Sequence, residues 1–475
     1  MARNQDLEIG NGSLCEPLIT QKTEEEEIVL QHSNNGGLWM LLFSTFVAVC
    51  GSFEYGSCVG YTAPTQFGIM DDLKLSYSQY SFFGSVLTIG GMIGAIMSGW
   101  IADSVGRKGA MRIASVSCIG GWLAVYLSVE SILLDLGRLL TGYGVGLLSY
   151  VVPVYIAEIS PRELRGALAT TNQIFISIAM LIAFVIGAFV KWRTLAITGI
   201  IPCMILLAGL YFIPESPRWL AMIGRQKEFQ VALRKLRGAN ADISEEEAEL
   251  TEYVVANELL PKVTVLDLLD RRNVRALAVG AGLMVFQQFV GYNAIVFYAG
   301  HVFVSAGVPP NVGSILYASL QVVVTALGAS LIDRTGRRPL LLLSASGLLL
   351  GSLLTGISFL LKAHQLEPEL VPVLAVAGIM IYMGFFSIGM CSIPWVMMSE
   401  IFPINTKGIA GSLVTLVNWF GSWIVSYTFN FLMSWSPHGI FFVFAAVCVM
   451  AIIFVIRVVP ETKGRTLEEI QASMS

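Results

Sequence analysis

The hexapeptide DSVGRK at residues 103–108 returns as DRTGRR at residues 333–338, 230 residues later in the chain. Each copy separates two long apolar runs, which cover 81–101 and 110–128 in the first case and 312–332 and 339–361 in the second. A helix needs about 20 apolar residues to cross the ~30 Å hydrocarbon core of a bilayer. The pattern therefore predicts two pairs of membrane-spanning helices, each joined by a short charged turn.

The composition of the whole chain agrees with this. Of its 475 residues, 55% are hydrophobic and only 13% are charged, whereas soluble proteins carry charge on about a quarter of their residues. This balance excludes an ordinary soluble enzyme and a disordered chain, and a net charge of -4 gives no sign of a nucleic-acid partner. The apolar runs predict twelve membrane spans: 38–60, 81–101, 110–128, 132–156, 168–190, 194–213, 275–300, 312–332, 339–361, 371–398, 409–433 and 438–459.

The positive charges set the expected orientation. If the N-terminus lies in the cytoplasm, the cytoplasmic segments hold 24 of the 29 Lys and Arg residues, as the positive-inside rule requires. An even number of spans then places the C-terminus on the same side. We expect an all-α membrane protein with twelve transmembrane helices in five parts: a disordered cytoplasmic tail (1–37), a six-helix bundle (38–213), cytoplasmic linker helices (214–274), a second six-helix bundle (275–459) and a cytoplasmic tail (460–475).

Two further patterns also occur twice. The pattern Glu-Ile-x-Pro-x-x-x-(Arg or Lys)-Gly starts at Glu158 and at Glu400, and the pair Pro-Glu starts at Pro214 and at Pro460. Three repeats in one order, each at a predicted cytoplasmic helix end, indicate a duplicated six-helix unit. Parallel repeats of this kind are typical of carriers whose two bundles move around a binding site at the bilayer midplane.

The charged residues of these repeats are complementary and lie on one membrane face, so we expect them to form a cytoplasmic gate that holds the two bundles together when the inside is closed. Exposed ion pairs contribute only ~0–1 kcal/mol each, but a network of them can bias two states that differ by a few kcal/mol. The simpler alternative, that they only fix the orientation, does not account for the acids. The expected gate residues are Asp103, Arg107, Glu158, Arg165, Glu215, Asp333, Arg337, Glu400 and Glu461.

Polar side chains, most of them amides, lie inside several predicted spans. Amides both donate and accept hydrogen bonds, which suits an uncharged solute with many hydroxyl groups, and tryptophan rings can pack on the apolar face of such a solute. A carboxylate or phosphate substrate calls for Arg or Lys instead, and only Arg138 stands inside a span. The alternative role is hydrogen bonding between helices, worth ~0.6 kcal/mol on average. The candidates are Asn172, Gln173, Gln287, Gln288, Asn293, Gln321, Ser387, Trp395, Asn418 and Trp419.

Nothing in the sequence points to an enzyme or a cofactor. The seven Cys form no CxxC pattern, five of them lie in apolar runs, and the four His stand in predicted tails or loops. We therefore expect buried reduced thiols and no metal site. The linker is too short for an enzyme domain, and it shows neither a phosphate-binding loop nor a catalytic Ser/His/Asp set, so we expect no catalytic residues.

Seven motifs stand in a characteristic order: Asp103-x-x-Gly-Arg-Lys, Gly137-Arg138, Pro153-x-Tyr-x-x-Glu158, Pro214-Glu-Ser-Pro-Arg218, Gln287-Gln-x-x-Gly-x-Asn293, Asp333-x-x-Gly-Arg-Arg and Pro460-Glu-Thr-Lys-Gly464. With them the chain resembles the sugar porters of the major facilitator superfamily over about 38–470. The segments 51–53 (GSF) and 59–61 (VGY) are most similar to the plant early-responsive-to-dehydration-like monosaccharide transporters.

The resemblance implies the major facilitator fold and alternating-access transport of a monosaccharide such as a glucose-like hexose. In such porters the second bundle holds most of the sugar hydroxyls. The contacts transfer to Gln173 in the first bundle and to Gln287, Gln288, Asn293, Asn418 and the nearby Trp395 in the second. Gln321 stands where many relatives have Asn, and Ser387 where several glucose facilitators have Glu, so the preference among hexoses stays open.

Transport can be facilitated or coupled to protons. Glu54 and Asp135 are the acids inside predicted spans, and Arg138 lies near Asp135 in sequence. A carboxyl paired with an arginine can take up a proton on one side and release it on the other, breaking the pair as it does so. Related proton-coupled porters place the acid two positions after Glu54, where this chain has Gly56, about 200° round the helix. Both modes therefore stay open.

The alternatives are a polyol or inositol carrier and a non-transporting sugar receptor. A receptor of that kind typically has a long cytoplasmic tail, whereas about 15 residues follow the last predicted span. The expected partners of a monomeric chain are a monosaccharide, the lipid bilayer and, if transport is coupled, protons. The acidic N-terminal tail and the resemblance favour the vacuolar membrane over the plasma membrane.

Overall fold

The computed structural model describes residues 16–161, 164–238, 241–259, 271–402 and 406–463, and these form helices with no β-strand among them. The first bundle contains α1 (Glu16–Leu73), α2 (Tyr77–Leu127), α3 (Ser131–Ile159), α4 (Arg165–Gly187), α5 (Trp192–Thr198) and α6 (Ile200–Phe212). The linker contains α7 (Pro217–Met222), α8 (Gln226–Arg237) and α9 (Ser244–Leu259). The second bundle contains α10 (Arg271–Phe289), α11 (Tyr292–Phe297), α12 (Ala299–Ala306), α13 (Pro310–Thr335), α14 (Arg337–Ala363), α15 (Leu370–Phe385), a π-helical turn (Phe386–Met390), α16 (Ile393–Ile401), α17 (Lys407–Trp435) and α18 (Pro437–Arg457).

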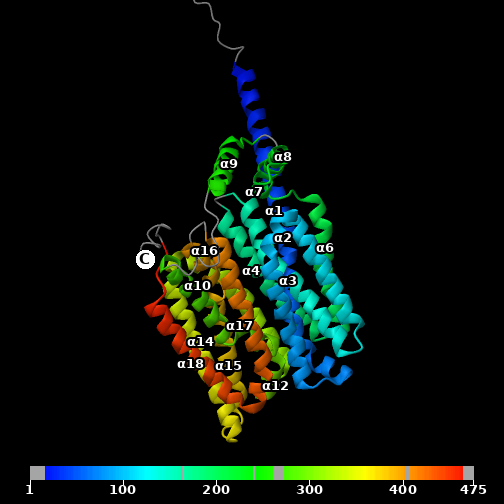
Figure 1. Cartoon of the computed structure of the whole chain (residues 1–475), viewed down its shortest axis with the longest axis vertical. Helices are drawn as coiled ribbons and strands as arrows, with labels where there is room; N and C mark the ends of the chain where they lie inside the picture. Colours follow the sequence, from blue (N-terminus) through cyan, green and yellow to red (C-terminus); the bar gives the residue numbers. More distant parts are fainter. Residues whose placement is uncertain (1–15, 162–163, 239–240, 260–270, 403–405, 464–475) are drawn as a thin grey trace, which may run out of the picture.

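The two bundles lie side by side, with the linker helices at one end (Figure 1). Helices α7, α8 and α9 gather at the end from which α1 projects, above the first bundle in this view. The predicted orientation makes this the cytoplasmic end, which we call the inner end, and the opposite one the outer end. The expected all-α fold of two bundles is confirmed.

Eleven helices among the described residues are long and apolar enough to span a membrane, compared with twelve predicted spans. The difference lies in α2, because its 51 residues would extend ~76 Å as a straight helix, more than twice the hydrocarbon core. Its backbone leaves the helical region at Gly106 (φ 82°, ψ 168°), inside the motif DSVGRK. The single element α2 thus carries two of the predicted spans.

The two arms of α2 fold back on each other. Gly90, which precedes the turn, packs closely on Leu139 of α3, and Gly121, which follows it, packs on Gly137 of the same helix. Because both contacts lie at one height on α3, the chain must reverse between them.

The second copy of the hexapeptide makes the same turn. Gly336, between α13 and α14, has φ 96° and ψ 165°, a region that only glycine adopts at low cost. A Cβ atom at Gly106 would lie 2.7 Å from a carboxylate oxygen of Glu215, and one at Gly336 would lie 3.0 Å from the corresponding oxygen of Glu461. Each turn therefore needs glycine for two reasons: the backbone conformation favours it, and a Cβ atom has no room.

Two spans of the second bundle are broken. Span seven is divided into α10, α11 and α12, with Gly291 in the left-handed region (φ 101°) between the first two. Span ten passes through the π-helical turn at Phe386–Met390. Irregular backbone at membrane depth is tolerated where it is buried in protein or lines a cavity, and it often marks a functional site.

The linker packs against the first bundle. The Arg237 guanidinium donates to both carboxylate oxygens of Glu246, at 2.8 and 2.7 Å, and to the carbonyl oxygen of Ile159 at 2.9 Å.

At the other end of the chain, α1 begins at Glu16, so the predicted disorder of the tail is wrong for residues 16–37, which contain many good helix formers. Residues 1–15 lie outside the described part.

Replacing Gly336 by alanine should destabilise the protein, because the turn then holds a Cβ atom in a strained conformation beside Glu461, at a cost of about 1–3 kcal/mol. We expect a lower unfolding temperature of Gly336→Ala in detergent, measured by intrinsic fluorescence. Gly120→Ala is the matched control, since a Cβ at Gly120 meets nothing within 4 Å. Equal unfolding temperatures for the two variants would show that the turn does not need glycine.

Candidate functional site

Two of the expected amides meet between α10 and α17. The Asn418 amide donates to Oε1 of Gln287 at 2.7 Å, and the Gln287 amide donates to the backbone carbonyls of Met390 and Cys391, at 2.7 and 3.0 Å. Both side chains are buried. A single chain of hydrogen bonds therefore joins α10 and α17 to the backbone released at the π-helical turn.

The other two amides form a second link. The Asn293 amide donates to Oε1 of Gln288 at 2.6 Å and to the Ser422 hydroxyl at 2.7 Å. Residues five apart in an unbroken helix point ~140° apart, so the left-handed break at Gly291 is what brings Asn293 back to Gln288. The structure thus gathers Gln287, Gln288, Asn293 and Asn418 in one place, and we call these four residues the amide cluster.

Aromatic side chains that the sequence analysis missed extend this region. The Gln321 amide donates to the hydroxyl of Tyr292 at 2.9 Å, while Oε1 of Gln321 is buried with no partner among the described residues. The Tyr292 ring stacks on Phe386, with centroids 3.9 Å apart and planes at 6°. The only indication of Tyr292 in the sequence was its position between Gly291 and Asn293 of the motif.

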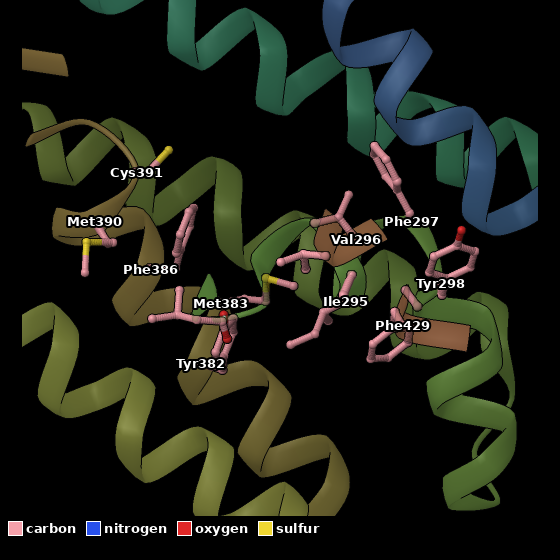
Figure 2. Close-up of a cluster of buried hydrophobic side chains, with 14 of the residues drawn as sticks. Ile295, Val296, Phe297, Tyr298, Tyr382, Met383, Phe386, Met390, Cys391 and Phe429 are labelled. Atoms are coloured by element: carbon pink, nitrogen blue, oxygen red, sulfur yellow. The ribbon is translucent and has the colours of Figure 1, made fainter. Parts of the chain in front are cut away.

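The broken span seven is embedded in apolar side chains. Figure 2 shows Ile295 and Val296 between the side chains of α15, including Tyr382, and those near Phe429. The Tyr382 hydroxyl donates to the carbonyl of Val290 at 2.9 Å, so it satisfies a backbone group beside the break. The apolar packing fixes the short helix α11 and, with it, Asn293.

The first bundle reaches this region at two points. The Gln173 amide lies 3.3 Å from Sγ of Cys391, and Trp419 of α17 packs against Tyr55 of α1, with centroids 6.2 Å apart. A Cβ atom at Gly91 of α2 would lie 2.7 Å from the Trp419 ring. Through Gln173 and the residues that contact Trp419, the first bundle therefore lies beside the region of the amide cluster.

Three candidates have other surroundings. Asn172 accepts a hydrogen bond from Ser52 at 2.6 Å, within the first bundle. The Ser387 hydroxyl donates to the carbonyl of Met383, one helical turn earlier. Trp395 is 38% exposed, and no ring contact joins it to the amide cluster among the described residues.

The expected gate residues of the first bundle form a network at its inner end. The Arg107 guanidinium donates to both oxygens of Glu158, at 2.8 and 2.9 Å, and to Asp103 at 3.0 Å. Glu158 also accepts from Ser216 at 2.6 Å, and Glu215 accepts from the backbone N–H of Lys108 at 3.1 Å.

The second bundle repeats this network. The Arg337 guanidinium donates to Glu400 at 2.8 Å, and Glu400 also accepts from the Thr462 hydroxyl at 2.5 Å. Glu461 accepts from four backbone N–H groups, including those of Arg337 and Arg338 at 3.1 and 3.0 Å. The residues stand at equivalent repeat positions: Arg337, Glu400, Glu461 and Thr462 correspond to Arg107, Glu158, Glu215 and Ser216.

These pairs do not join the two bundles in this conformation; the latch is expected when the inner end is closed, so it stays a prediction. Each described pair lies within one bundle, because the arginine that follows the glycine turn points to the acid of a neighbouring helix in its own repeat. Arg165 is exposed and makes no ion pair among the described residues. The side chain of Asp333 lies outside the described part.

The two equivalent acids of the networks differ in environment. Burial raises the pKa of Glu215 above its ordinary value, against the opposing effect of the N–H groups of Ser216 and Lys108. Burial also acts on Glu461, but the N–H groups that donate to it outweigh that effect and hold its pKa below the ordinary value. The two acids thus differ in how far the donated N–H groups offset the effect of burial.

The expected proton-coupling residues do not pair with one another. The Arg138 guanidinium donates to the Cys58 carbonyl at 3.0 Å and to the Thr62 hydroxyl, and it lies over the rings of Tyr61 and Phe83. No ion pair joins it to an acid among the described residues.

The two acids occupy different surroundings. Glu54 is fully buried and accepts from the indole N–H of Trp122 at 2.6 Å. Asp135 is half-buried, and its Oδ1 has no hydrogen-bond partner among the described residues.

Residues 34–474 match the family described as "Sugar (and other) transporter". The chain belongs to this sugar transporter family. The transporter is 63% identical to sugar transporter ERD6-like 8 of Arabidopsis thaliana over 99% of both chains, and 60% identical to ERD6-like 7 of the same plant over 91% of this chain and 94% of the relative. The expected resemblance is thus confirmed, and the family consists of carriers rather than enzymes.

Solved structures show the same fold. The inward open conformation of the xylose transporter XylE from E. coli matches with a TM-score of 0.76 and 26% identity, covering 91% of this chain and 99% of that one. The proton:xylose symporter XylE bound to 6-bromo-6-deoxy-D-glucose matches with a TM-score of 0.75 and 26% identity, over 93% and 100%.

In this sugar transporter several contacts between the bundles lie at the outer end. Asn430 of α17 donates to the Ser81 hydroxyl of α2 at 2.9 Å, and the rings of Tyr80 and Tyr298 meet edge to face with centroids 6.4 Å apart. We call these residues the outer seam. The described networks at the inner end stay within their own bundles, so this conformation is closed at the outer end.

His301 also belongs to the outer seam. Its ring lies 5.6 Å from that of Tyr77, centroid to centroid, across the two bundles. The expectation that every histidine stands in a tail or loop is wrong here, because span seven restarts as α12 after its breaks and carries His301 into the contact.

The outer seam should open during transport. In the double variant Ser81→Cys, Asn430→Cys, an oxidant should form a disulfide that abolishes sugar uptake into proteoliposomes, and a reductant should restore it. Ser81→Cys alone is the control and should keep its uptake after oxidation. Full uptake through the cross-linked double variant would contradict opening at this seam.

Proposed function

We propose that this sugar transporter carries monosaccharides, with glucose-like hexoses as the substrate class, through the amide cluster by alternating access. The observation that carries the proposal is the gathering of Gln287, Gln288, Asn293 and Asn418 at the broken helix of the second bundle, with Gln173 approaching from the first. A solved relative in the same fold is described as bound to a bromo-deoxyglucose.

The chemistry of the amide cluster suits a neutral polyol ring. In this conformation the Asn418 amide donates to Gln287, and the Asn293 amide donates to Gln288. A sugar hydroxyl both donates and accepts, so it can replace each amide partner without leaving a polar group unpaired, which would cost about 1–3 kcal/mol. Oε1 of Gln321 is a further buried acceptor that a hydroxyl can reach once the cluster rearranges. Trp419 and Tyr292 supply aromatic surface beside these amides.

The two bundles then supply the movement. Each inner network ties the helix ends of one repeat together, so each bundle moves as a unit, while the outer seam consists of neutral contacts between the bundles. Release of the outer seam admits sugar from the outside, and its closure leaves the amide cluster facing the cytoplasm. One chain contains both bundles, so transport by a monomer follows.

We propose facilitated transport in the vacuolar membrane. Arg138 is held by Cys58, Thr62 and two rings, and Glu54 by Trp122, so the acid and the base have separate partners in this conformation. The vacuolar membrane follows from the resemblance to the plant subgroup and from the acidic tail.

Removing one amide of the cluster should weaken sugar binding. We expect Asn418→Ala to lower the affinity for glucose by about tenfold or more, the equivalent of ~1.4 kcal/mol, because Gln287 loses its partner and the sugar loses a contact. The measurement is radiolabelled uptake by proteoliposomes with fructose, xylose and inositol as competitors. Asn311→Ala, an exposed amide at the outer end of α13, is the control. Unchanged affinity in Asn418→Ala and Gln287→Ala would remove the site, and stronger competition by inositol than by glucose would favour the polyol carrier.

Facilitated transport should not respond to a proton gradient. We expect the initial rate of hexose uptake by wild-type proteoliposomes to be the same with and without an imposed pH difference at zero membrane potential. Internal sugar should also level off at the external concentration. Accumulation above that level, driven by the gradient, would establish proton coupling instead.

A further inference from the structure

Four potential metal ligands meet inside the first bundle, on helices that are far apart in sequence. Glu54 and Cys58 stand one turn apart on α1, Cys118 lies on the second arm of α2, and Cys203 on α6, and all four are fully buried. A carboxylate oxygen of Glu54 and the sulfur atoms of Cys118 and Cys203 lie within 4.8 Å of one another. Sγ of Cys58 is 3.2 Å from Oε1 of Glu54.

The carboxylate at the centre of this group is incompletely satisfied. Oε1 of Glu54 accepts from the Trp122 indole and from the Cys58 thiol, but Oε2 has no hydrogen-bond partner among the described residues. A buried carboxylate that lacks a partner is costly, so it must carry a proton or bind a cation. Arg138 does not supply that cation directly, because its guanidinium contacts Cys58 O and Thr62 instead.

The donor set is selective for one class of ion. Thiolate sulfur and carboxylate oxygen together suit Zn²⁺ and the softer Cd²⁺, whereas Mg²⁺ and Ca²⁺ require oxygen ligands throughout. Zn–S bonds of about 2.3 Å and Zn–O bonds of about 2.0–2.2 Å place the ligand atoms of a tetrahedral site ~3.3–3.8 Å apart. The three atoms lie within 4.8 Å of one another, so none of the distances between them has to shorten by more than about 1.5 Å for a tetrahedral site.

The charges also balance. Binding of a divalent ion releases the protons of the Cys118 and Cys203 thiols to solvent, together with any proton on Glu54, and leaves two thiolates and one carboxylate around the metal. The resulting net charge of about -1 on the site is offset by the guanidinium of Arg138, whose bond to the Cys58 carbonyl is 3.0 Å long. No charge is then left uncompensated in the membrane.

The surrounding structure leaves room for the sulfur atoms. A Cβ at Gly144 would lie 2.3 Å from Sγ of Cys118, so this glycine makes space for the thiol. An apolar cavity of about 340 Å³ is lined by Trp122, which holds Glu54, and by Pro202, which precedes Cys203.

We infer that Glu54, Cys118 and Cys203 bind one Zn²⁺-like ion that ties α1, α2 and α6 together, with the Cys58 thiol beside the ligand set. The spacing of the cysteines along the chain gives no sign of this site, because each of three helices supplies one ligand. The site lies in the first bundle, apart from the amide cluster, so its test is independent of sugar binding.

The experiment uses Cd²⁺ as the probe on the full-length protein in nanodiscs, because thiolate ligands give Cd²⁺ an ultraviolet charge-transfer band. We expect wild-type protein to bind about one Cd²⁺ per chain with this band and to unfold at a higher temperature. Cys203→Ser and Glu54→Gln should lower the affinity for Cd²⁺ at least about tenfold, the equivalent of ~1.4 kcal/mol. Cys448→Ser, which removes a buried free thiol of α18 in the second bundle, should behave like wild type.

The result that overturns the inference is the absence of the band in folded wild-type protein. An equal band in wild type and in both Cys203→Ser and Glu54→Gln would overturn it as well, since the ion would then bind elsewhere. If a variant fails to fold, as judged by size-exclusion chromatography, the wild-type and Cys448→Ser measurements still decide the outcome. Glucose uptake is recorded in parallel, so a loss of the amide cluster's function is distinguished from a loss of metal binding.

Discussion

Hydrocarbon offers no hydrogen-bond partner, so every polar group inside the two bundles must find its partner in the protein. The break at Gly291 and the π-helical turn release backbone carbonyls, and Tyr382 and Gln287 satisfy them. The side-chain oxygens of Gln287 and Gln288 accept hydrogen bonds from Asn418 and Asn293. Helix breaks and amide cluster are thus one structure: without the breaks the amides would point apart, and without the amides the breaks would be too costly in a membrane.

The two repeats have the same turns, but the polar groups inside the two bundles differ. Gly106 and Gly336 adopt the same conformation, and each copy anchors a carboxylate on backbone N–H groups beyond the turn. The second bundle fills its centre with neutral amides, whereas the first holds Glu54 among thiols. Under the proposed function, the second bundle exchanges its hydrogen bonds with the sugar while the first keeps its own.

Hydropathy predicted the spans, because long apolar runs leave few alternatives, while the repeated motifs and the family resemblance predicted the fold of two bundles. The motif order predicted which amides gather, although the role of Tyr292 needed the stacking on Phe386 that only the structure shows. The partners of the gate residues in this conformation could not be predicted, because charge patterns show which residues are complementary, not which helices are neighbours. The group of thiols beside Glu54 was missed for the same reason, since its members are 60 or more residues apart in sequence, except Glu54 and Cys58 on α1.

The distribution of charge explains how such a molecule can change shape. The Arg107–Glu158 and Arg337–Glu400 pairs are partly or largely buried and have several partners, so breaking them would be costly, and they lie within the bundles. Among the described residues, contacts between the bundles include neutral ones: Asn430 with Ser81, aromatic rings at the outer end, and Trp419 on Gly91. Separating neutral surfaces exposes no unpaired charge to lipid or to a sugar. The strong interactions therefore preserve each half, and the weak ones form the boundary along which the halves move.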